Sequence, residues 1–416
     1  MDLDLSSGAQ LDKLEPRDTQ PLADPAAAVR EALRHPIGTL PLRELVRREQ
    51  RIAILVNDIT RLARTDLFLP VLADELNRAG IPDAQIFAVF ALGNHRPQTP
   101  EEQRQIVGED LARRIALFNH DCRSPADLVS IGRTRRGHEA LVNRRVREAD
   151  GVILTGEVTY HPILGYSGGR KSLFPGVAGE DFIRANHSLI LDPGCRSGLL
   201  DGNPAHEDLL EACRMFDPDF LLNVVMAPSG EIAHVVAGHY ELAHRAGCEL
   251  ADRTYAVALD KPYDVVVAGA GGFPFDIDLR QAHKGMDYAV RALREGGTLV
   301  YFAECRDGSG TRVLEEWVRR FSSAADMAQA IRTHFELGAQ KAYSLVQLAE
   351  RYRVVLVSTL HPEFVKECHL CPAATAREAQ DELARVLAKA GTRSRIAYIP
   401  NAGLVMPVPK VGARAS

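Results

Sequence analysis

Short runs of apolar residues recur along the chain and alternate with longer stretches in which apolar residues have helical spacing. The first two runs lie at residues 51–57 and 84–90. Unbroken apolar runs of this length are typical of strands that are buried on both faces of a parallel sheet. Further strands are predicted at residues 151–155, 221–225, 264–268, 298–302, 354–358 and 396–400.

The stretches between these runs predict helices. Residues 67–79 have apolar side chains at helical spacing and are followed by Gly80, and glycine is common just beyond a helix end. Residues 100–107 begin with Glu101 and Glu102, whose negative charge suits the positive end of the helix dipole. Other helices are predicted at residues 26–33, 240–253, 279–295, 313–321 and 324–336. Strands that alternate with helices predict an α/β fold in which helices flank parallel-rich sheets.

The alternation starts afresh near residues 255–263, where a helical stretch gives way to Pro262 and another strand. A chain of 416 residues is long enough for two or three domains. We therefore predict an N-terminal cofactor-binding domain at residues 1–260 and a C-terminal domain at residues 261–395. The tail at residues 396–416 contains the last strand and could return to the N-terminal domain.

The composition is that of an ordinary globular protein, with 46% hydrophobic and 25% charged residues. The formal net charge of −5 gives no general reason to bind nucleic acid or an anionic membrane surface. No apolar run reaches the roughly 18 residues of a membrane span, and the acidic residues 1–5 do not resemble a signal peptide. The seven cysteines are odd in number and scattered, which argues against a disulfide framework. We therefore expect a cytoplasmic protein with reduced thiols and no nucleic-acid or membrane partner.

Two further features have ordinary explanations. Cys368 and Cys371 form a C-x-x-C motif, but a zinc or redox site would usually need a second ligand pair or a thioredoxin-like context. We therefore favour ordinary thiols in a loop next to Pro372. Trp317 lies in a predicted helix, and we expect it in the core rather than in a substrate pocket.

Polar side chains gather after the first two strands, at the positions where loops of α/β folds bind ligands. The first strand is followed by Asp58, Thr60 and Arg61. These residues could hold a ribose and an anion, or they could be a helix cap beside a surface arginine. The second strand is followed by His95, in a loop marked by glycine and proline, although a single loop histidine is more often without a catalytic role.

A dense glycine-rich block, H-P-I-L-G-Y-S-G-G-R-K-S-L-F-P-G, follows the third strand at residues 161–176. Its backbone N–H groups and cationic end suit a phosphate. It is not a P-loop, because Arg170 replaces a required glycine and Pro175 would break the following helix. Lys171 could be a tether, a Schiff-base former or a phosphate ligand, or the block could be a structural turn. His187 adds a third histidine to this region, which raises the option of a metal.

The second predicted domain contains weaker signals. A glycine cluster at residues 269–272 follows a strand and is a weak sign of nucleotide binding. Gln281 and Lys284 are three residues apart in a predicted helix, so they share one face. This pair could hold a carboxylate, or it could belong to a solvated helix face. Residues 304–310 form another polar turn at a strand end.

Taken together, these motifs resemble the nickel-pincer lactate racemase family, over residues from about 24 to 402. The motifs are D-x-T-R, G-x-H-R, H-x-x-x-G-Y-S-G-G-R-K-x-x-x-P-G, N-H and Q-x-x-K, in this order. The glycine-lysine block is highly specific, and the other motifs agree with it in order and spacing. The resemblance implies two α/β domains with the active site in the cleft between them.

The resemblance also implies a cofactor, the nickel-pincer nucleotide, which is a pyridinium mononucleotide with nickel in a sulfur–carbon–sulfur pincer. At the matching positions, Lys171 would hold it covalently through a thioamide, and His187 would be the nickel ligand from the protein. His95 and His161 would be the acid/base catalysts. The other implied contacts are Asp58, Thr60, Arg61, Ser167, Gly168 and Gly169 with the cofactor, and Arg61, Gln281 and Lys284 with the substrate.

We therefore expect an isomerase that inverts the α-carbon of a 2-hydroxy acid. Hydride transfer to the pyridinium ring would give a 2-keto acid, while one histidine removes the hydroxyl proton and the other returns it. The expected partners are the small 2-hydroxy acid and the proteins that build the cofactor, and a homodimer is left open. Two other functions fit the same motifs: a mononucleotide- or phosphate-binding protein, and a metal-dependent lyase or dehydratase.

Overall fold

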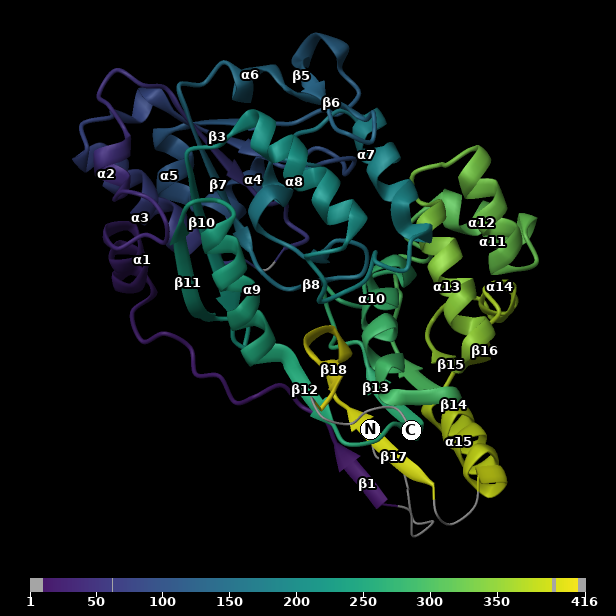
Figure 1. Cartoon of the computed structure of the whole chain (residues 1–416). Helices are drawn as coiled ribbons and strands as arrows, with labels where there is room; N and C mark the ends of the chain where they lie inside the picture. The colour runs from purple at the N-terminus through teal and green to yellow at the C-terminus, as the bar shows by residue number, and fades with distance from the viewer. Residues whose placement is uncertain (1–9, 62, 391–393, 411–416) are drawn as a thin grey trace. The chain divides into compact units, whose positions relative to one another are not determined.

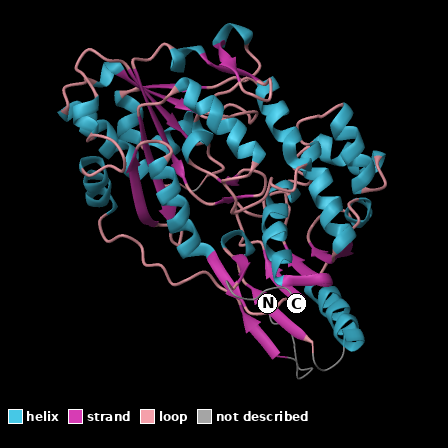
Figure 2. Ribbon diagram, in the orientation of Figure 1, coloured by secondary structure: helices cyan, strands magenta, loops and turns pink. Residues whose placement is uncertain are grey.

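The unbroken apolar runs become the central strands of two six-stranded sheets, which belong to two structural units of the computed structural model (Figures 1 and 2). Unit 1 comprises residues 1–17 and 255–416, and unit 2 comprises residues 18–254. The structure describes residues 10–61, 63–390 and 394–410. Helices flank both sheets, so the predicted α/β fold with parallel-rich sheets is confirmed.

The sheet of unit 2 consists, in spatial order, of β11 (Ile232–Gly238), β10 (Phe220–Met226), β7 (Gly151–Glu157), β2 (Ile52–Val56), β3 (Ile86–Phe90) and β4 (Ala116–Asn119). Neighbouring strands are parallel, except that β11 is antiparallel to β10 at one edge. Every residue of β2, β3 and β10 is buried, as their apolar sequences predict. Two hairpins lie outside this sheet: β5 (Leu128–Arg133) with β6 (Glu139–Asn143), and β8 (Tyr160–His161) with β9 (Gly165–Tyr166).

Helix ends in unit 2 follow local sequence signals. α4 (Pro100–Val107) begins with a capping box, in which Thr99 and Glu102 each accept the other's backbone N–H. α3 (Thr65–Arg78) ends just before Gly80, which has a φ of +97°. The other helices are α1 (Pro25–Arg34), α2 (Leu42–Leu45), α5 (Glu109–Arg114), α6 (Arg144–Arg147), α7 (Glu180–His187), α8 (Pro204–Phe216) and α9 (Leu242–Tyr255).

The sheet of unit 1 is parallel throughout. Its strands, in spatial order, are β1 (Gln10–Lys13), β17 (Arg395–Ile399), β13 (Tyr263–Gly269), β14 (Leu293–Phe302), β15 (Arg353–Val357) and β16 (Cys371–Ala373). β12 (Ala256–Leu259) and β18 (Met406–Pro409) form a separate parallel pair. The helices are α10 (Leu279–Ala289), α11 (Arg312–Arg320), α12 (Ala324–Thr333), α13 (Ala339–Arg351), α14 (Pro362–Glu367) and α15 (Ala376–Ala390). Within the described residues, no helix is both long and apolar enough to cross a membrane.

The predicted domain ranges differ from the two units at both ends of the chain. β1 pairs with β17, and β17 pairs with β13, so all three strands belong to unit 1 (Figure 1). The predicted range 1–260 therefore includes two strands of unit 1, β1 and β12. The described part of the tail at residues 396–416 stays in unit 1, where its strands β17 and β18 pair with β1 and β12. Pairing between strands hundreds of residues apart leaves no local signal in the sequence.

The predicted helix at residues 279–295 is too long. α10 ends at Ala289, a 3-10 turn at Val290–Ala292 follows, and β14 already begins at Leu293. Leu293 pairs with Tyr263 in the parallel ladder. Strand pairing thus overrides the helical spacing of the apolar residues in this segment.

The predictions for Trp317 and for the C-x-x-C motif have different outcomes. Trp317 is 3% exposed, and its ring N–H donates to Glu336, so its place in the core is confirmed. Cys371 begins β16, so its assignment to a loop is wrong. Cys368 is fully buried, and this burial raises the pKa of its thiol to about 12. A thiol in this state is a poor nucleophile and a poor metal ligand at neutral pH.

Candidate active site

The glycine-rich block follows β7 and presents Lys171 from a 3-10 turn at Gly169–Ser172. The chain enters this turn through Gly168 and Gly169, whose φ angles are +70° and +56°. L side chains rarely adopt this backbone conformation. A Cβ atom on Gly169 would also lie 2.5 Å from the ring of His244. Backbone conformation and close packing therefore both require glycine at positions 168 and 169. These two glycines determine the position of the Lys171 backbone.

Side chains from neighbouring strands hold this turn in place. The hydroxyl of Ser172 donates to the carbonyl of Thr155 at 2.5 Å, and the N–H of Gly169 donates to Oδ1 of Asn223 at 2.8 Å. The hydroxyl of Ser167 donates to a carbonyl at the end of β7 at 2.8 Å. These buried hydrogen bonds make the loop rigid, so Lys171 is presented from a defined backbone.

The guanidinium of Arg170 is buried beneath the same loop and is 1% exposed. It donates to the carbonyl of Leu164 at 2.8 Å and to that of Gly168 at 3.4 Å, and no carboxylate of the described residues is hydrogen-bonded to it. Burial lowers its pKa to about 10, which still leaves it positively charged at neutral pH. This charge lies next to His244, whose Nε2 donates to the carbonyl of Ser167 at 2.8 Å.

Three buried histidines are held in the neutral form by their surroundings. Burial and then the charge of Arg170 lower the pKa of His244 to about 3. The same two causes lower the pKa of His206 still further. In unit 1, burial and the charge of Lys341 lower the pKa of His283 to about 3. An imidazole in the unfolded chain has a pKa of about 6.5, so the unfolded state binds protons that the folded state excludes.

We expect the free energy of unfolding to fall as the pH is lowered from about 6.5 to about 4.5. Each of these histidines contributes up to about 1.4 kcal/mol per pH unit in this window, because its folded-state pKa is depressed. Urea titrations at several pH values measure this slope. His244→Gln should reduce the slope, whereas His35→Gln, at an exposed histidine, should leave it unchanged. Equal slopes in the wild type and His244→Gln would contradict the assignment.

The loops after β2 and β3 meet because these strands are parallel neighbours. The buried carboxylate of Asp58 accepts the Nδ1–H of His95 at 2.5 Å and the hydroxyl of Thr60 at 2.5 Å. Burial acts to raise the pKa of Asp58, but the hydrogen bond and charge of His95, with Arg61 and Thr60, hold it well below its usual range. Asp58 is therefore ionised, and Nδ1 of His95 bears a proton; in the neutral form of this ring, Nε2 has the lone pair of a base.

His161 has the opposite arrangement of ring nitrogens. Its Nδ1 accepts the backbone N–H of Ile163 at 3.3 Å and that of Leu164 at 3.1 Å. Backbone N–H groups can only donate, so Nδ1 bears the lone pair and the neutral ring has its proton on Nε2. The two predicted catalytic histidines thus present different atoms: a lone pair on Nε2 of His95 and an N–H on Nε2 of His161.

His187 is the last residue of α7 and is half-buried. Its Nδ1 donates to the carbonyl of Ile183 at 3.0 Å, which places the lone pair on Nε2. A backbone hydrogen bond from the other ring nitrogen is the usual companion of a metal-binding histidine. Within the described residues, there is no group of three or more His, Cys, Asp or Glu side chains that could hold a metal ion.

Gln281 and Lys284 lie in unit 1, on the first turns of α10. The ammonium of Lys284 donates to Oε1 of Gln281 at 2.6 Å, so the expectation that they share a helix face is confirmed. Both residues are half-buried, rather than part of a fully solvated face.

The structure brings most of the predicted residues of unit 2 to one edge of its sheet. Thr60 and His95 are both hydrogen-bonded to Asp58, and Lys171 shares its loop with the other glycine-block residues. The two loops are joined by a backbone hydrogen bond from Gly93 to Gly176 at 2.8 Å.

Sequence reasoning missed the residues beneath the loop, which are Arg170, Asn223 and His244. Asn223 was detectable, because it is a polar residue in the middle of an apolar strand sequence. His244 gave no such signal, since a histidine is ordinary on a helix.

Family models match most of the chain. The model of the lactate racemase N-terminal domain matches residues 1–198, and that of the lactate racemase C-terminal domain matches residues 259–406. The lactate racemase of Thermoanaerobacterium thermosaccharolyticum is 33% identical over 358 residues, which cover 84% of each chain. The lactate racemase of Lactiplantibacillus plantarum is 33% identical over 384 residues, which cover 90% of this chain and 88% of the relative.

Solved structures agree with these matches. The lactate racemase apoprotein from Thermoanaerobacterium thermosaccharolyticum superposes with a TM-score of 0.89 at 30% identity, covering 98% of this chain and 97% of that one. A protein from Thermotoga maritima superposes with a TM-score of 0.72 at 19% identity, covering 93% and 99%, and this likeness concerns the fold alone. With both domain models matched and two relatives one-third identical over most of their length, the chain belongs to the lactate racemase family and is an isomerase.

Proposed function

We propose that this isomerase inverts the α-carbon of a 2-hydroxy acid, with lactate as the first substrate to test. The observation that carries the proposal is the Asp58–His95 pair, which is held next to the glycine loop of Lys171. A base with a fixed tautomer beside a rigidly presented lysine fits a reaction in which a tethered cofactor and a proton acceptor act on one substrate. The names of the two relatives support lactate as that substrate.

The residues present fit a nickel-pincer nucleotide. Lys171 would form the covalent tether, and the backbone of Gly168 and Gly169 would line the cofactor, while the N–H of Gly169 stays donated to Asn223. In the tautomer that the Ile183 hydrogen bond indicates, the lone pair of His187 is on Nε2, the atom that would bind a metal ion. The described residues provide no multi-histidine or cysteine cluster, so nickel at His187 would take its other donors from the tethered group. Imidazole combined with soft sulfur donors suits nickel.

When bound, this cofactor supplies a pyridinium ring that accepts hydride from the α-carbon and returns it. The residues of the chain transfer the proton of the substrate hydroxyl. Nε2 of His95 accepts the proton of the substrate hydroxyl, and the Asp58 carboxylate stabilises the imidazolium that results. The 2-keto acid formed in this way is planar at the former α-carbon, so either enantiomer can be regenerated.

His161 would transfer the hydroxyl proton on the other side of the substrate, but it is not equivalent to His95. In its neutral form it can donate a hydrogen bond from Nε2 to the substrate oxygen. It can release a proton from Nε2 only after Nδ1 has been protonated, which displaces the N–H groups of Ile163 and Leu164. His95 is therefore ready as a base, and His161 becomes an acid after it has gained a second proton.

The substrate carboxylate needs a cationic partner, and the resemblance offers two candidates, Arg61 and Lys284. Arg61 follows the catalytic aspartate and can form a bidentate pair with a carboxylate. The ammonium of Lys284 is oriented by Oε1 of Gln281. Either cation would anchor the carboxylate while the ketone group turns.

Mass spectrometry of protein produced together with the cofactor pathway tests the proposal. We expect an adduct that maps to Lys171, nickel in the same preparation, and racemisation of either lactate enantiomer. Lys171→Ala should lose all three properties. Lys366→Ala is the matched control, because Lys366 is an exposed lysine whose partner is Glu363 on the same helix, and it should keep all three.

Three results would contradict the proposal. Full racemase activity in Lys171→Ala would exclude the tether. Loss of water from the substrate without inversion at the α-carbon would identify a lyase or dehydratase. Tight binding of a mononucleotide without turnover of any 2-hydroxy acid would identify a binding protein.

A further inference from the structure

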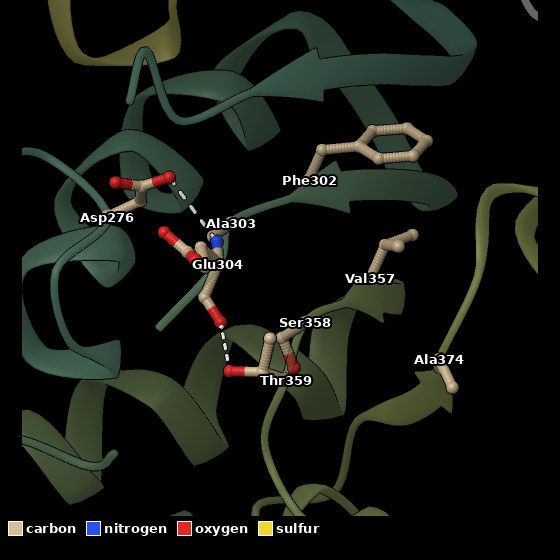
Figure 3. Close-up of a pocket in the computed structure, with 8 residues that line it drawn as sticks. All are labelled: Asp276, Phe302, Ala303, Glu304, Val357, Ser358, Thr359 and Ala374. Atoms are coloured by element: carbon tan, nitrogen blue, oxygen red, sulfur yellow. Dashed lines mark hydrogen bonds between the residues drawn. The ribbon is translucent and has the colours of Figure 1, made fainter. Parts of the chain in front are cut away.

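Unit 1 contains a hollow of about 300 Å³ at the carboxyl ends of its strands (Figure 3). Its apolar side is formed by Phe302 and Val357, the last residues of β14 and β15, which are direct neighbours in the sheet. Its polar side is formed by the carboxylates of Asp276 and Glu304. Its volume is at the lower end of the range for small-molecule sites.

The polar side of the hollow has acceptor atoms that the protein does not use. One oxygen of Asp276, Oδ2, accepts the backbone N–H of Glu304 at 3.3 Å. Thr359 donates its hydroxyl to the carbonyl of Glu304 at 2.8 Å and so ties the two strand ends together. Within the described residues, the Glu304 carboxylate has no hydrogen bond or ion pair, and it is exposed. The hollow thus combines an apolar surface with carboxylates that can accept hydrogen bonds.

The sheet topology places this hollow at a position where nucleosides bind in other parallel sheets. From β13 the chain proceeds to β14 and β15 on one side, and later to β17 on the other side of β13. In sheets of this order, a glycine-rich turn follows the first strand, and an acidic residue at the end of the second strand binds the ribose hydroxyls. Here glycines follow β13 at residues 269–272, and Glu304 lies two residues beyond β14.

The usual phosphate position of such sheets is closed in this chain. A Cβ atom on Gly271 would lie 2.2 Å from the side chain of Asn401, so this side chain occupies the space above the glycine turn. The N-terminus of α10 is capped by Asp278, which accepts the N–H of Gln281 at 2.7 Å. The amide of Asn401 at one place and the carboxylate of Asp278 at the other leave no positive site for a phosphate. The open space is confined to the side of β14 and β15.

We propose that this hollow binds an uncharged ribonucleoside, with adenosine as the representative ligand. The vicinal hydroxyls would donate to Glu304 and Asp276, and the flat base would lie on Phe302 and Val357. Topology alone does not determine function, so the proposal rests on the unused acceptors and the apolar floor. It concerns unit 1 alone and does not depend on the proposed racemase reaction.

Calorimetric titration of the full-length protein, prepared without cofactor, tests this site. The probes are adenosine, 2′-deoxyadenosine and adenosine 5′-monophosphate. We expect adenosine to bind at least about 10-fold more tightly than either of the others, because one analogue lacks a donor to Glu304 and the other brings a phosphate towards carboxylates. Glu304→Gln should weaken adenosine binding by about 10-fold or more, because its amide replaces one charged acceptor.

Two variants serve as controls. Glu316→Gln changes an exposed glutamate on α11 in the same unit and should leave adenosine binding unchanged. Lys171→Ala should also leave it unchanged, which separates this site from the glycine loop of unit 2. Hydrogen exchange should show protection at residues 302–304 and 357–359 when adenosine is bound. Equal binding of the three probes, no binding of adenosine at millimolar concentration, or an unaltered affinity in Glu304→Gln would overturn the proposal.

Discussion

Replacement of Asp58 with asparagine is expected to lower kcat for racemisation by about 10³-fold or more, with a much smaller change in KM. The carboxylate of Asp58 holds the proton of His95 on Nδ1 and balances the charge that the imidazole gains when it accepts a substrate proton. An amide can present its NH₂ group to Nδ1, which would move the ring proton to Nε2. The ring would then offer a donor where the reaction needs an acceptor.

The measurement is steady-state kinetics in both directions on protein that has the adduct on Lys171. Asp66→Asn is the matched control, because the carboxylate of Asp66 pairs with Arg64 at a half-exposed position, and its kcat should change by less than about 2-fold. Added imidazole should partly restore His95→Ala but should not restore Asp58→Asn. Wild-type kcat in Asp58→Asn would show that another group determines the tautomer of His95.

Replacement of Gly165 with alanine is expected to destabilise unit 2 by about 2–5 kcal/mol. Gly165 has a φ of +77°, and its Cβ atom would lie 2.0 Å from the carbonyl oxygen of Leu199. The cost therefore has two parts, a backbone conformation that L residues avoid and a collision with rigid backbone. Because Gly165 begins the segment that leads to Lys171, the variant should also load less cofactor.

Gly202→Ala separates these two parts. Gly202 has a similar φ of +80°, but no atom lies within 4 Å of the position that its Cβ would take. It should cost about 1–2 kcal/mol, from conformation alone. Urea unfolding followed by circular dichroism measures both variants. Trp317, the single tryptophan, lies in unit 1, so its fluorescence reports separately on the unit that was not altered. Equal destabilisation by the two substitutions would show that the backbone at Leu199 moves to accommodate the added methyl group.

The sequence predicts the inner strands of both sheets well, because burial on two faces produces unbroken apolar runs such as those at β2, β3 and β10. It does not predict the edge strands of the two sheets, which are β1, β4, β11 and β16. It also places Asp58 and His95 directly after two of these strands, where loops of α/β folds bind ligands. The hydrogen bond between them could not be predicted, because their separation depends on which strands are neighbours in the sheet. Strand order is a property of the whole fold.

The roles of individual atoms were also beyond prediction. The opposite tautomers of His95 and His161 depend on a carboxylate in one case and on two backbone N–H groups in the other. The glycine block gave a clear motif, but the burial of Arg170 beneath it could not be predicted. An arginine next to a lysine in the sequence is typical of an exposed loop. Burial of Arg170 depends on carbonyl groups that converge only after the loop has folded.

The pairing of β1 with β17 has a consequence for the order in which the protein is made. Residues 10–13 leave the ribosome at the start of synthesis, but their partners at residues 395–399 emerge about 385 residues later. At about 5–20 residues per second, β1 waits roughly 20–80 s for its neighbour. Unit 2, at residues 18–254, is complete well before then. A released chain that ends at residue 254 should therefore already resist proteolysis in unit 2, while residues 10–13 are still cleaved.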